Sequence, residues 1–335
     1  MLSLSSIRAS NAAFNHSVSH PPVAVFVGGT SGIGEGMART FAEHTKGNSS
    51  IIIVGRNRAA ADAILASLPK PAEKDNLKVA REFIQCDVTL MKNVKNTAQD
   101  ILSRHSKINY LIMSPGIMTL VGRDETPEGI DKKMAVHYYG RWSFLRELLP
   151  ALKKAKDDGE DAAAMSVFAA GNGGEIDVGD LAMKKNYSTK NAALALPTYN
   201  DLMMQARSLN FLRLITLIHF FVQSYSAQYP DLKLIQASPG FVRTALASSS
   251  SSPLIRAASC LMPLFRPLSV SATECGEYMW NAIWKTADKP GAWRTGSNGE
   301  DIGKTRYFGT ESEREKLWKH TEEVVNAATA VSNSS

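Results

Sequence analysis

The sequence predicts an α/β fold in which helices cover both faces of a doubly wound parallel sheet. Short apolar runs rich in β-branched residues alternate with segments of helical periodicity, and this alternation is typical of such a sheet. A chain of 335 residues is long enough for one large α/β domain with its own core, or for two small domains. The alternation favours a single domain, with a C-terminal lid and helix.

Six runs have the length and composition of buried strands. They cover residues 23–27, 50–57, 81–89, 108–116, 162–171 and 231–240. Between them the apolar residues follow helical spacing, most clearly in the long segment that begins at Lys132. Near the C-terminus, "SATECGEYMWNAIW" begins with the Ser/Thr–Glu pattern of a helix start, and a polar helix, "SEREKLWKHTEEVVNAA", closes the domain.

Residues 22–335 are predicted to form the domain, preceded by an N-terminal arm over residues 1–21 that packs on its surface. The arm is rich in serine and has no acid, which faintly resembles a transit peptide, but it lacks the apolar run of a secretory signal. Residues 245–270 form the predicted substrate lid. A membrane-surface patch is the alternative for its apolar part, "LIRAASCLMPLFRPL" (254–268), and the lid is favoured because these 15 residues with two prolines cannot span a bilayer.

An unusual apolar insert occupies residues 207–223, "RSLNFLRLITLIHFFVQ". One interpretation is an extended helix at a subunit interface, which would make the protein a homo-oligomer, or at a membrane surface. The other interpretation is a translated intron. Arg213, His219 and the short length of the insert argue against a helix that spans a membrane.

The net charge is +6, from 38 basic and 32 acidic residues. No dense Lys/Arg block with interleaved aromatic residues appears, which argues against a nucleic-acid partner. The mild excess of positive charge favours anionic ligands, including a phosphorylated cofactor. Cys86, Cys260 and Cys275 form no CxxC pair and no metal pattern, so we expect no metal, and reduced thiols in a cytoplasmic protein.

A glycine-rich turn, "GGTSGIG", follows the first predicted strand and opens a helix. Glycine lets the backbone turn sharply and approach a pyrophosphate closely, and the helix N-terminus offers free N–H groups and a positive dipole end. In this context the turn predicts a dinucleotide site of the Rossmann-like kind, while a tight turn without a ligand is the alternative. The predicted contacts are Gly28, Thr30, Ser31, Gly32, Ile33 and Gly34.

The end of the second predicted strand separates NAD from NADP. A site for NAD usually has an acid there, which holds the ribose hydroxyls. This chain has "VGRNR", with Arg56 and Arg58 and no acid, and guanidinium groups suit a 2′-phosphate. NADP(H) is therefore the predicted cofactor, with Arg56 as its contact; a solvated Arg56 is the alternative. Asp87, at the tip of the third strand, would accept a hydrogen bond from the adenine amine or form a local turn.

These features resemble the short-chain dehydrogenase/reductase family over about residues 22–245. The likeness is carried by the glycine turn and by "CDVT" (86–89), "SPG" (114–116) and "SPGFVRT" (238–244). The cofactor contacts that the resemblance implies are Gly116 and, on the nicotinamide side, Pro239, Gly240 and Thr244.

Divergent fungal members of the family, found in secondary-metabolite pathways, are the most similar. Three of their segments have counterparts here: "IRASN" (7–11), "YYGRWSF" (138–144) and "TYNDLM" (198–203). The resemblance therefore implies an enzyme that acts on a natural product.

The family's chemistry needs four groups. A tyrosine moves the proton at the substrate oxygen, and a lysine four residues later lowers the tyrosine's pKa and holds the ribose. A serine stabilises the substrate oxygen, and an asparagine anchors a relay water. Tyr199 is the predicted tyrosine, because Pro197 suits a helix start and apolar spacing follows, but the residue four positions later is the uncharged Met203.

The serine and asparagine positions are also changed. In "SVFAAG", Phe168 stands where the family has serine, and Ser166 lies two residues earlier on the same strand face. His137 stands where the family has asparagine. It is a candidate to replace the relay, with a packed histidine as the alternative.

A competing register pairs Tyr187 with Lys190 in "YSTKNAAL" (187–194). Lys190 comes one residue too soon for the family's spacing, and Pro197 would break that helix early. Tyr199 is therefore preferred.

The sequence predicts an NADP-dependent oxidoreductase that interconverts a ketone and a secondary alcohol on a small apolar natural product. Without the lysine, oxidation is weakened more than reduction, because an unassisted phenol titrates near pH ~10 whereas a neutral tyrosine can donate its proton. Two alternatives remain: a non-redox enzyme on the same fold, such as an isomerase or cyclase, and a cofactor-binding protein with weakened catalysis.

Overall fold

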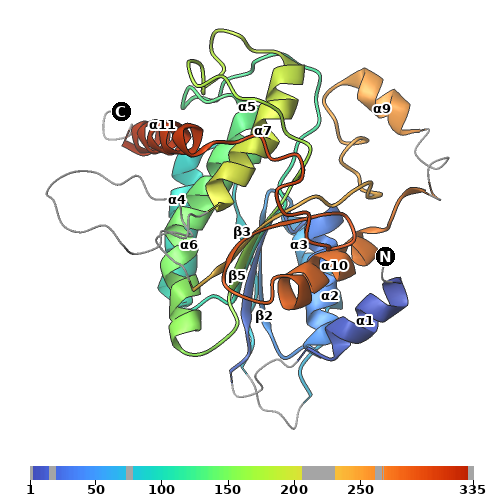
Figure 1. The fold of residues 1–335 in the computed structure, drawn as a ribbon. Helices are drawn as coiled ribbons and strands as arrows, with labels where there is room; N and C mark the ends of the chain where they lie inside the picture. Colours follow the sequence, from blue (N-terminus) through green and yellow to red (C-terminus); the bar gives the residue numbers. More distant parts are fainter. Residues whose placement is uncertain are drawn as a thin grey trace, which may run out of the picture.

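The computed structural model describes residues 3–14, 20–72, 78–205, 231–260, 266 and 268–330. A seven-stranded parallel sheet runs through its centre, in the order β3-β2-β1-β4-β5-β6-β7 (Figure 1). The strands are β1 (Val23–Val27), β2 (Ser50–Gly55), β3 (Arg81–Gln85), β4 (Tyr110–Met113), β5 (Ala163–Val167), β6 (Lys233–Ala237) and β7 (Gly291–Thr295). The strand order reverses between β1 and β4, and sheets of this kind bind ligands beyond the carboxyl ends of the strands at that point.

The doubly wound parallel sheet and the single domain predicted from the sequence are confirmed. β1 has the predicted bounds, and each of the other five predicted runs contains one observed strand. β7 was not predicted. Its five residues, which include Trp293 and Arg294, form no continuous apolar run, and it becomes a strand by pairing with β6.

Helices cover both faces of the sheet, and alternate strand residues face opposite layers (Figure 1). Ala24 and Phe26 of β1 belong to one core, and Val25 and Val27 belong to the other. The first layer consists of α2 (Gly32–His44), α3 (Arg58–Ser67) and α10 (Ala272–Asn281), which continues into the π-helical turn η4 (Ala282–Thr286). The second consists of α4 (Met91–Arg104), α6 (Gly140–Asp157), α7 (Thr189–Met204) and α11 (Glu311–Ala330).

The long helix predicted from Lys132 is a run of α5 (Lys132–Met134), a π-helical turn η2 (Ala135–Tyr139) and α6. The carboxylate of Asp131 caps its start by accepting hydrogen bonds from the backbone N–H groups of Lys133 (3.0 Å) and Met134 (3.2 Å). Such π-helical turns occur frequently at functional sites, and this one carries His137.

Helix α7 differs from the prediction. The sequence placed a helix start at Pro197, but α7 begins at Thr189 and contains Pro197 in its interior. The hydroxyl of Ser188 caps the helix by accepting a 2.9 Å hydrogen bond from the backbone N–H of Asn191. This cap and the buried second half of the helix outweigh the cost of an interior proline, so the expectation that Pro197 breaks the helix was wrong.

The N-terminal arm packs on the first helix layer, and the C-terminal helix packs on the second. The arm contributes α1 (Leu4–Ala12), where the side-chain amide of Asn11 donates to the backbone oxygen of Glu277 (2.9 Å) and to its carboxylate (2.7 Å). The helix start predicted in "SATECGEYMWNAIW" is confirmed as a capping box between Ser271 and Glu274 at the start of α10. The predicted C-terminal helix is α11, which packs against α4 and α7.

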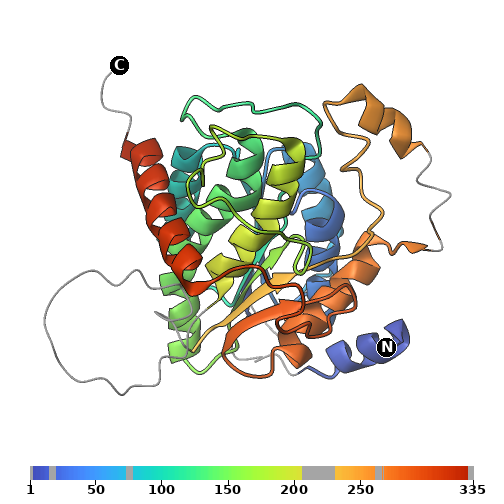
Figure 2. The same ribbon diagram turned by 45° about the horizontal axis from the view of Figure 1, so that its top comes forward.

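The predicted lid, residues 245–270, contains the short helix α9 (Pro253–Ser259). Figures 1 and 2 both show α9 standing apart from the layers that cover the sheet. Residues 261–265 and 267 of the lid, and the whole insert 207–223, lie outside the described residues. None of the helices in the described part of the chain is long and apolar enough to cross a membrane.

Candidate functional site

The glycine-rich turn joins β1 to α2 at the carboxyl edge of the sheet. Gly28 has φ +84°, a conformation that side chains disfavour, and a Cβ at Gly34 would lie 2.5 Å from the backbone oxygen of Gly28. Ser31 precedes α2 without capping it through its side chain, which leaves the N–H groups of the first turn available. The turn therefore has the tight backbone and the free helix N-terminus that a pyrophosphate requires.

A crevice of about 750 Å³ opens beside this turn. The predicted cofactor residues that line it are Gly28, Thr30, Ser31, Gly32, Ile33, Arg56, Asp87, Gly116 and Thr244. The loop after β6 closes over the turn, since a Cβ at Gly32 would lie 3.1 Å from a methyl carbon of Thr244. Residues that follow β1, β2, β3, β4 and β6 thus meet where the strand order reverses.

Three predicted cofactor residues do not line this crevice. Gly34 supports the turn from within the helix, as its close approach to Gly28 shows. The backbone oxygen of Pro239 accepts a weak hydrogen bond of 4.0 Å from the thiol of Cys275, and Gly240 lies against Ser297. Pro239 and Gly240 therefore lie beyond the part of the crevice that the structure shows open.

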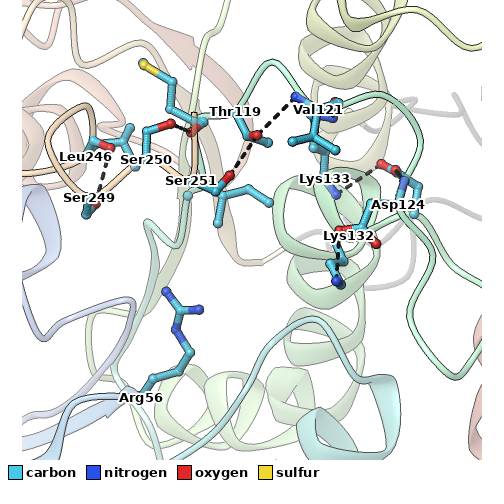
Figure 3. Close-up of a pocket in the computed structure, with 14 residues that line it drawn as sticks. Arg56, Thr119, Val121, Asp124, Lys132, Lys133, Leu246, Ser249, Ser250 and Ser251 are labelled. Carbon is cyan, nitrogen blue, oxygen red and sulfur yellow. Dashed lines mark hydrogen bonds and ion pairs between the residues drawn. The ribbon is translucent and has the colours of Figure 1, made fainter. Parts of the chain in front are cut away.

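Arg56 follows β2 and lines both the crevice and an adjoining cavity of about 330 Å³. Figure 3 shows its guanidinium reaching up toward the lid serines, Ser249 to Ser251, across the cavity. Within the described part of the chain this guanidinium has no hydrogen bond or ion pair. The neighbouring Arg58 instead stacks on Phe83, with 4.9 Å between its guanidinium carbon and the ring centroid. Arg56 is thus the free cation at the crevice among the two candidates.

Asp87 lines the crevice and also shapes its own turn. One carboxylate oxygen accepts hydrogen bonds from the backbone N–H (3.0 Å) and the hydroxyl (2.8 Å) of Thr89. The turn-forming interpretation is therefore realised. The second carboxylate oxygen remains available for a ligand in the crevice.

Tyr199 lies in the core between α7 and η2, and only 1% of its surface is exposed. Its hydroxyl donates a 3.1 Å hydrogen bond to the backbone oxygen of Leu181, and its ring packs against Tyr138. Burial raises the pKa of this phenol well above its usual value. Tyr199 lines neither the crevice nor the adjoining cavity, so its placement does not favour the catalytic role predicted for it.

Ser166 is fully buried on β5 and its hydroxyl is engaged on both sides. It accepts a 2.7 Å hydrogen bond from Arg141 and donates one of 2.9 Å to the side-chain oxygen of Asn200. The amide of Asn200 donates in turn to the backbone oxygen of His137 (2.8 Å). This network ties β5, α6, α7 and η2 together, and it leaves Ser166 without a free hydroxyl for a substrate.

His137 faces the sheet edge, where its ring stacks on Phe168 with 4.8 Å between centroids. Its Nε2 accepts a 3.1 Å hydrogen bond from the backbone N–H of Ile117, which lines the crevice. Burial, with the charges of Arg141 and Lys133, lowers the pKa of His137 to about 3. The imidazole is therefore neutral at physiological pH and its acceptor nitrogen is occupied, which favours the packed interpretation over a relay.

Lys133 is a residue that sequence analysis missed. Its ammonium donates a 2.7 Å hydrogen bond to the hydroxyl of Tyr187 and others to the backbone oxygens of Val121 and Gly122. Lys133 lines the cavity beside the crevice. The sequence signal for Lys133 was its position one helical turn before His137. That position does not reveal its contact with Tyr187, which forms only in the folded chain.

Comparison with known proteins agrees with this arrangement. The family model of short chain dehydrogenases matches residues 22–172. The oxidoreductase AN1596 of Emericella nidulans is 33% identical over 280 residues, which cover 83% of this chain and 75% of that protein. The chain belongs to the short chain dehydrogenase family.

A second fungal relative supports this assignment. The oxidoreductase andH of Emericella variicolor is 30% identical to this short chain dehydrogenase over 282 residues, 83% of this chain and 74% of that protein. The resemblance to fungal oxidoreductases inferred from the sequence is thereby confirmed.

Solved structures share its fold at low identity. A protein from Mycobacterium Paratuberculosis has a TM-score of 0.63 at 18% identity, covering 94% of this chain and 97% of that one. An alcohol dehydrogenase from Thermococcus sibiricus complexed with 5-hydroxy-NADP has a TM-score of 0.53 at 17% identity, covering 82% and 96%. A 3-ketoacyl-(acyl-carrier-protein) reductase from Brucella melitensis complexed with NADH has 0.53 at 18%, covering 85% and 99%.

In this short chain dehydrogenase neither candidate tyrosine has a lysine four residues later. Four residues after Tyr199 stands Met203, which is buried. Four residues after Tyr187 stands Asn191, whose side-chain amide donates a hydrogen bond to the backbone oxygen of Asn186. Lys190 is exposed, and no contact between it and Tyr187 is recorded among the described residues. The cation that does reach a candidate tyrosine is Lys133.

Proposed function

We propose that this short chain dehydrogenase binds NADP(H) and interconverts a ketone and a secondary alcohol on an apolar natural product of secondary metabolism. The observation that carries the cofactor is Arg56, a free guanidinium at the end of β2 where no acid is present. The crevice fits a dinucleotide in its tight glycine backbone and its open helix N-terminus. When bound, the coenzyme supplies or accepts the hydride at the substrate carbon.

Each residue at the crevice has a defined task in this proposal. The N–H groups at the start of α2 hold the pyrophosphate, and Arg56 binds the 2′-phosphate. The free oxygen of Asp87 accepts from the adenine amine. Gly116 and Thr244 border the crevice on the side of β4 and β6.

The character of the substrate is argued from the surface around the cavity. Met118, Val121 and Leu246 line it and keep 36% to 48% of their surface exposed. Apolar side chains gathered at the mouth of a cavity favour an apolar ligand. Two fungal relatives carry the name oxidoreductase, which is consistent with redox chemistry.

Calorimetric titration of the wild type with NADPH and NADH tests the cofactor. NADPH should bind at least about 10-fold more tightly, and Arg56→Ala should remove most of that preference, since hydrogen bonds to charged groups contribute about 1.5–3 kcal/mol. Arg58→Ala is the matched control and should keep the preference, because Arg58 stacks on Phe83. Equal binding of both nucleotides in the wild type would remove the assignment of NADP(H).

Turnover is tested by following NADPH absorbance with acetophenone, cyclohexanone, 2-decanone and 2-decalone. Consumption of NADPH with a ketone that depends on enzyme concentration supports the reductase. Binding of NADPH with no consumption across the panel would instead favour a cofactor-binding protein or a non-redox enzyme. This second candidate function, a cofactor-binding protein or a non-redox enzyme, is supported by Phe168. Its ring stacks on His137 at the position where the family has a serine hydroxyl.

A further inference from the structure

Helix α9 of the lid turns its polar face toward the domain and its apolar face outward. At about 100° per residue, Leu254, Ile255 and Ala258 fall on one face of α9, and Arg256 falls on the opposite face. The guanidinium of Arg256 donates a 3.0 Å hydrogen bond to the backbone oxygen of Ser250, which is buried. Leu254 keeps 70% of its surface exposed, and none of the seven residues of α9 is buried. An amphipathic helix that packs on a core has the reverse orientation.

Hydrogen bonds to the loop after β4 fix the lid in this position. The hydroxyl of Ser250 donates to the backbone oxygen of Met118 (2.6 Å), and the hydroxyl of Ser252 accepts from the backbone N–H of Leu120 (2.8 Å). Ser252 immediately precedes α9. These bonds bring the apolar side chains of the loop beside those of the lid, while α9 itself stands apart from the helix layers (Figures 1 and 2).

Five exposed apolar side chains form a surface that we call the lid face. They are Met118, Leu120 and Val121 of the loop after β4 and Leu246 and Leu254 of the lid, and they keep 36% to 70% of their surface exposed. Single exposed apolar residues are ordinary, whereas a group of neighbouring ones marks a surface that another molecule covers. Met118, Val121 and Leu246 also line the smaller cavity, so the lid face borders the mouth of that cavity.

The charges of the lid are positive. No aspartate or glutamate occurs in residues 241–270, a stretch that contains Arg243, Arg256 and Arg266. Arg243 forms an ion pair of 3.6 Å with Glu274. Arg256 and Arg266 are exposed, and neither has an acidic partner among the described residues. The lid therefore combines outward apolar side chains with two uncompensated positive charges, which complement an anionic surface.

We propose that the lid face docks on a bilayer that contains anionic lipids, with the apolar face of α9 among the headgroups. Helices that lie in the plane of a membrane surface combine apolar side chains with arginines in this way. A helix of seven residues cannot supply the i, i+3, i+4 and i+7 anchors by which a helix fills the groove of a partner protein. The first acid of the loop after β4 is Asp124, and an ion pair of 2.8 Å with Lys132 balances its charge.

This inference goes beyond the proposed function, because it assigns a surface and not a reaction. Docking by the lid face holds the mouth of the smaller cavity against the membrane, since Met118, Val121 and Leu246 belong to both. An apolar ligand dissolved in the bilayer then reaches the cavity without crossing water. Binding to vesicles is measured without coenzyme or substrate, so it is tested separately from the proposed chemistry.

Vesicle flotation of the full chain tests the docking. With phosphatidylcholine vesicles that contain about 30 mol% phosphatidylglycerol, the bound fraction should be at least about fivefold higher than with phosphatidylcholine alone, and salt should lower it by screening the arginines. The double substitution Leu120→Asp with Leu254→Asp should lower the bound fraction at least about fivefold, because it places charge on the apolar surface. Val178→Asp with Leu194→Asp is the matched control: both residues are 38% exposed and lie outside the lid face, and binding should not change.

Cys260 provides a second measurement at the end of α9. It is exposed, whereas Cys86 and Cys275 are buried, so a thiol-reactive, polarity-sensitive dye such as acrylodan labels Cys260 selectively. The emission of the dye should shift to shorter wavelength when the anionic vesicles are added, because the end of α9 moves from water into the headgroup region. Phosphatidylcholine vesicles alone should leave the emission unchanged.

Three results would overturn the inference and leave the proposed function standing. The first is a wild type that does not bind anionic vesicles or whose dye emission does not shift, and the second is binding that the double substitution at Leu120 and Leu254 leaves unchanged. The third is a dimer, measured by light scattering, that this substitution dissociates, because a second copy of the chain would then cover the lid face. Failure to bind NADPH or to reduce a ketone counts against the proposed function alone.

Discussion

The guanidinium of Arg141 donates a 2.7 Å hydrogen bond to the hydroxyl of Ser166, and both side chains are buried beneath the candidate site. Arg141 donates further hydrogen bonds to the backbone oxygens of Met113, Pro115 and Val167, at the ends of β4 and β5. Ser166 is thus part of the support that holds the carboxyl ends of two central strands. Ser166 therefore has a structural role in the described structure, because its hydroxyl is hydrogen-bonded to Arg141 and Asn200.

Ser166→Ala should therefore be a stability variant. It leaves Arg141 with one acceptor fewer and Asn200 without a donor, which costs about 1–3 kcal/mol in the free energy of unfolding. Urea denaturation measures this loss, and NADPH titration should show a dissociation constant within about threefold of the wild type. Lost ketone reduction at unchanged stability would instead support the catalytic role predicted for Ser166 from the sequence.

Tyr199→Phe tests the catalytic role predicted for Tyr199 from the sequence. The change removes the hydrogen bond to the backbone oxygen of Leu181, and we expect a loss of about 1 kcal/mol in stability with kcat within a factor of three of the wild type. Thermal unfolding and NADPH consumption measure the two quantities. If Tyr199→Phe abolishes turnover in a folded protein, the catalytic role predicted for Tyr199 from the sequence is right.

His137 predicts a pH dependence of stability. Its folded-state pKa is about 3, below the value of about 6.5 expected when unfolded, so the unfolded state binds the proton more tightly between these values. The contribution of His137 is complete above about pH 6.5 and is lost as the pH falls toward 3, with a slope of up to about 1.4 kcal/mol per pH unit.

Urea denaturation between pH 7 and pH 4.5 checks this expectation. His137→Gln should show a shallower loss of stability with falling pH than the wild type does, because the uncharged amide does not titrate. Parallel curves for the two proteins would mean that the imidazole is not held neutral in the folded state.

Gly34→Ala tests the tight turn. The new Cβ would meet the backbone oxygen of Gly28 at 2.5 Å and the hydroxyl of Ser114 at 2.6 Å, so the turn must open. NADPH binding should weaken about 10-fold or more by calorimetry, with the folded fraction measured alongside by circular dichroism. Unaltered affinity in the folded variant would show that the nucleotide does not depend on this turn.

Local signals in the sequence predicted much of the fold. β1 is five apolar residues buried on both faces, and the capping box of Ser271 and Glu274 is a contact within one helical turn. Such features depend on neighbours in the chain. The crevice could also be predicted from local signals. The glycine turn, Arg56 and Asp87 each come shortly after a strand, and parallel strands bring their carboxyl ends together at one edge of the sheet.

The candidate catalytic residues depend on contacts between distant segments, which the sequence does not display. Pro197 was expected to begin a helix, but the Ser188 cap starts α7 earlier and carries Tyr199 into the core. Lys133 and Tyr187 are 54 residues apart and meet only because the loop before α7 folds over α5. A search for a lysine four residues after a tyrosine could not find this pair.

A crystal structure of the protein grown with excess NADPH tests the central claim most directly. We predict the pyrophosphate at the N-terminus of α2, the 2′-phosphate within hydrogen-bond distance of the Arg56 guanidinium, and the nicotinamide on the side of the crevice that adjoins the smaller cavity. A crevice that remains closed to the nucleotide, or a 2′-phosphate directed away from Arg56 into solvent, would contradict it.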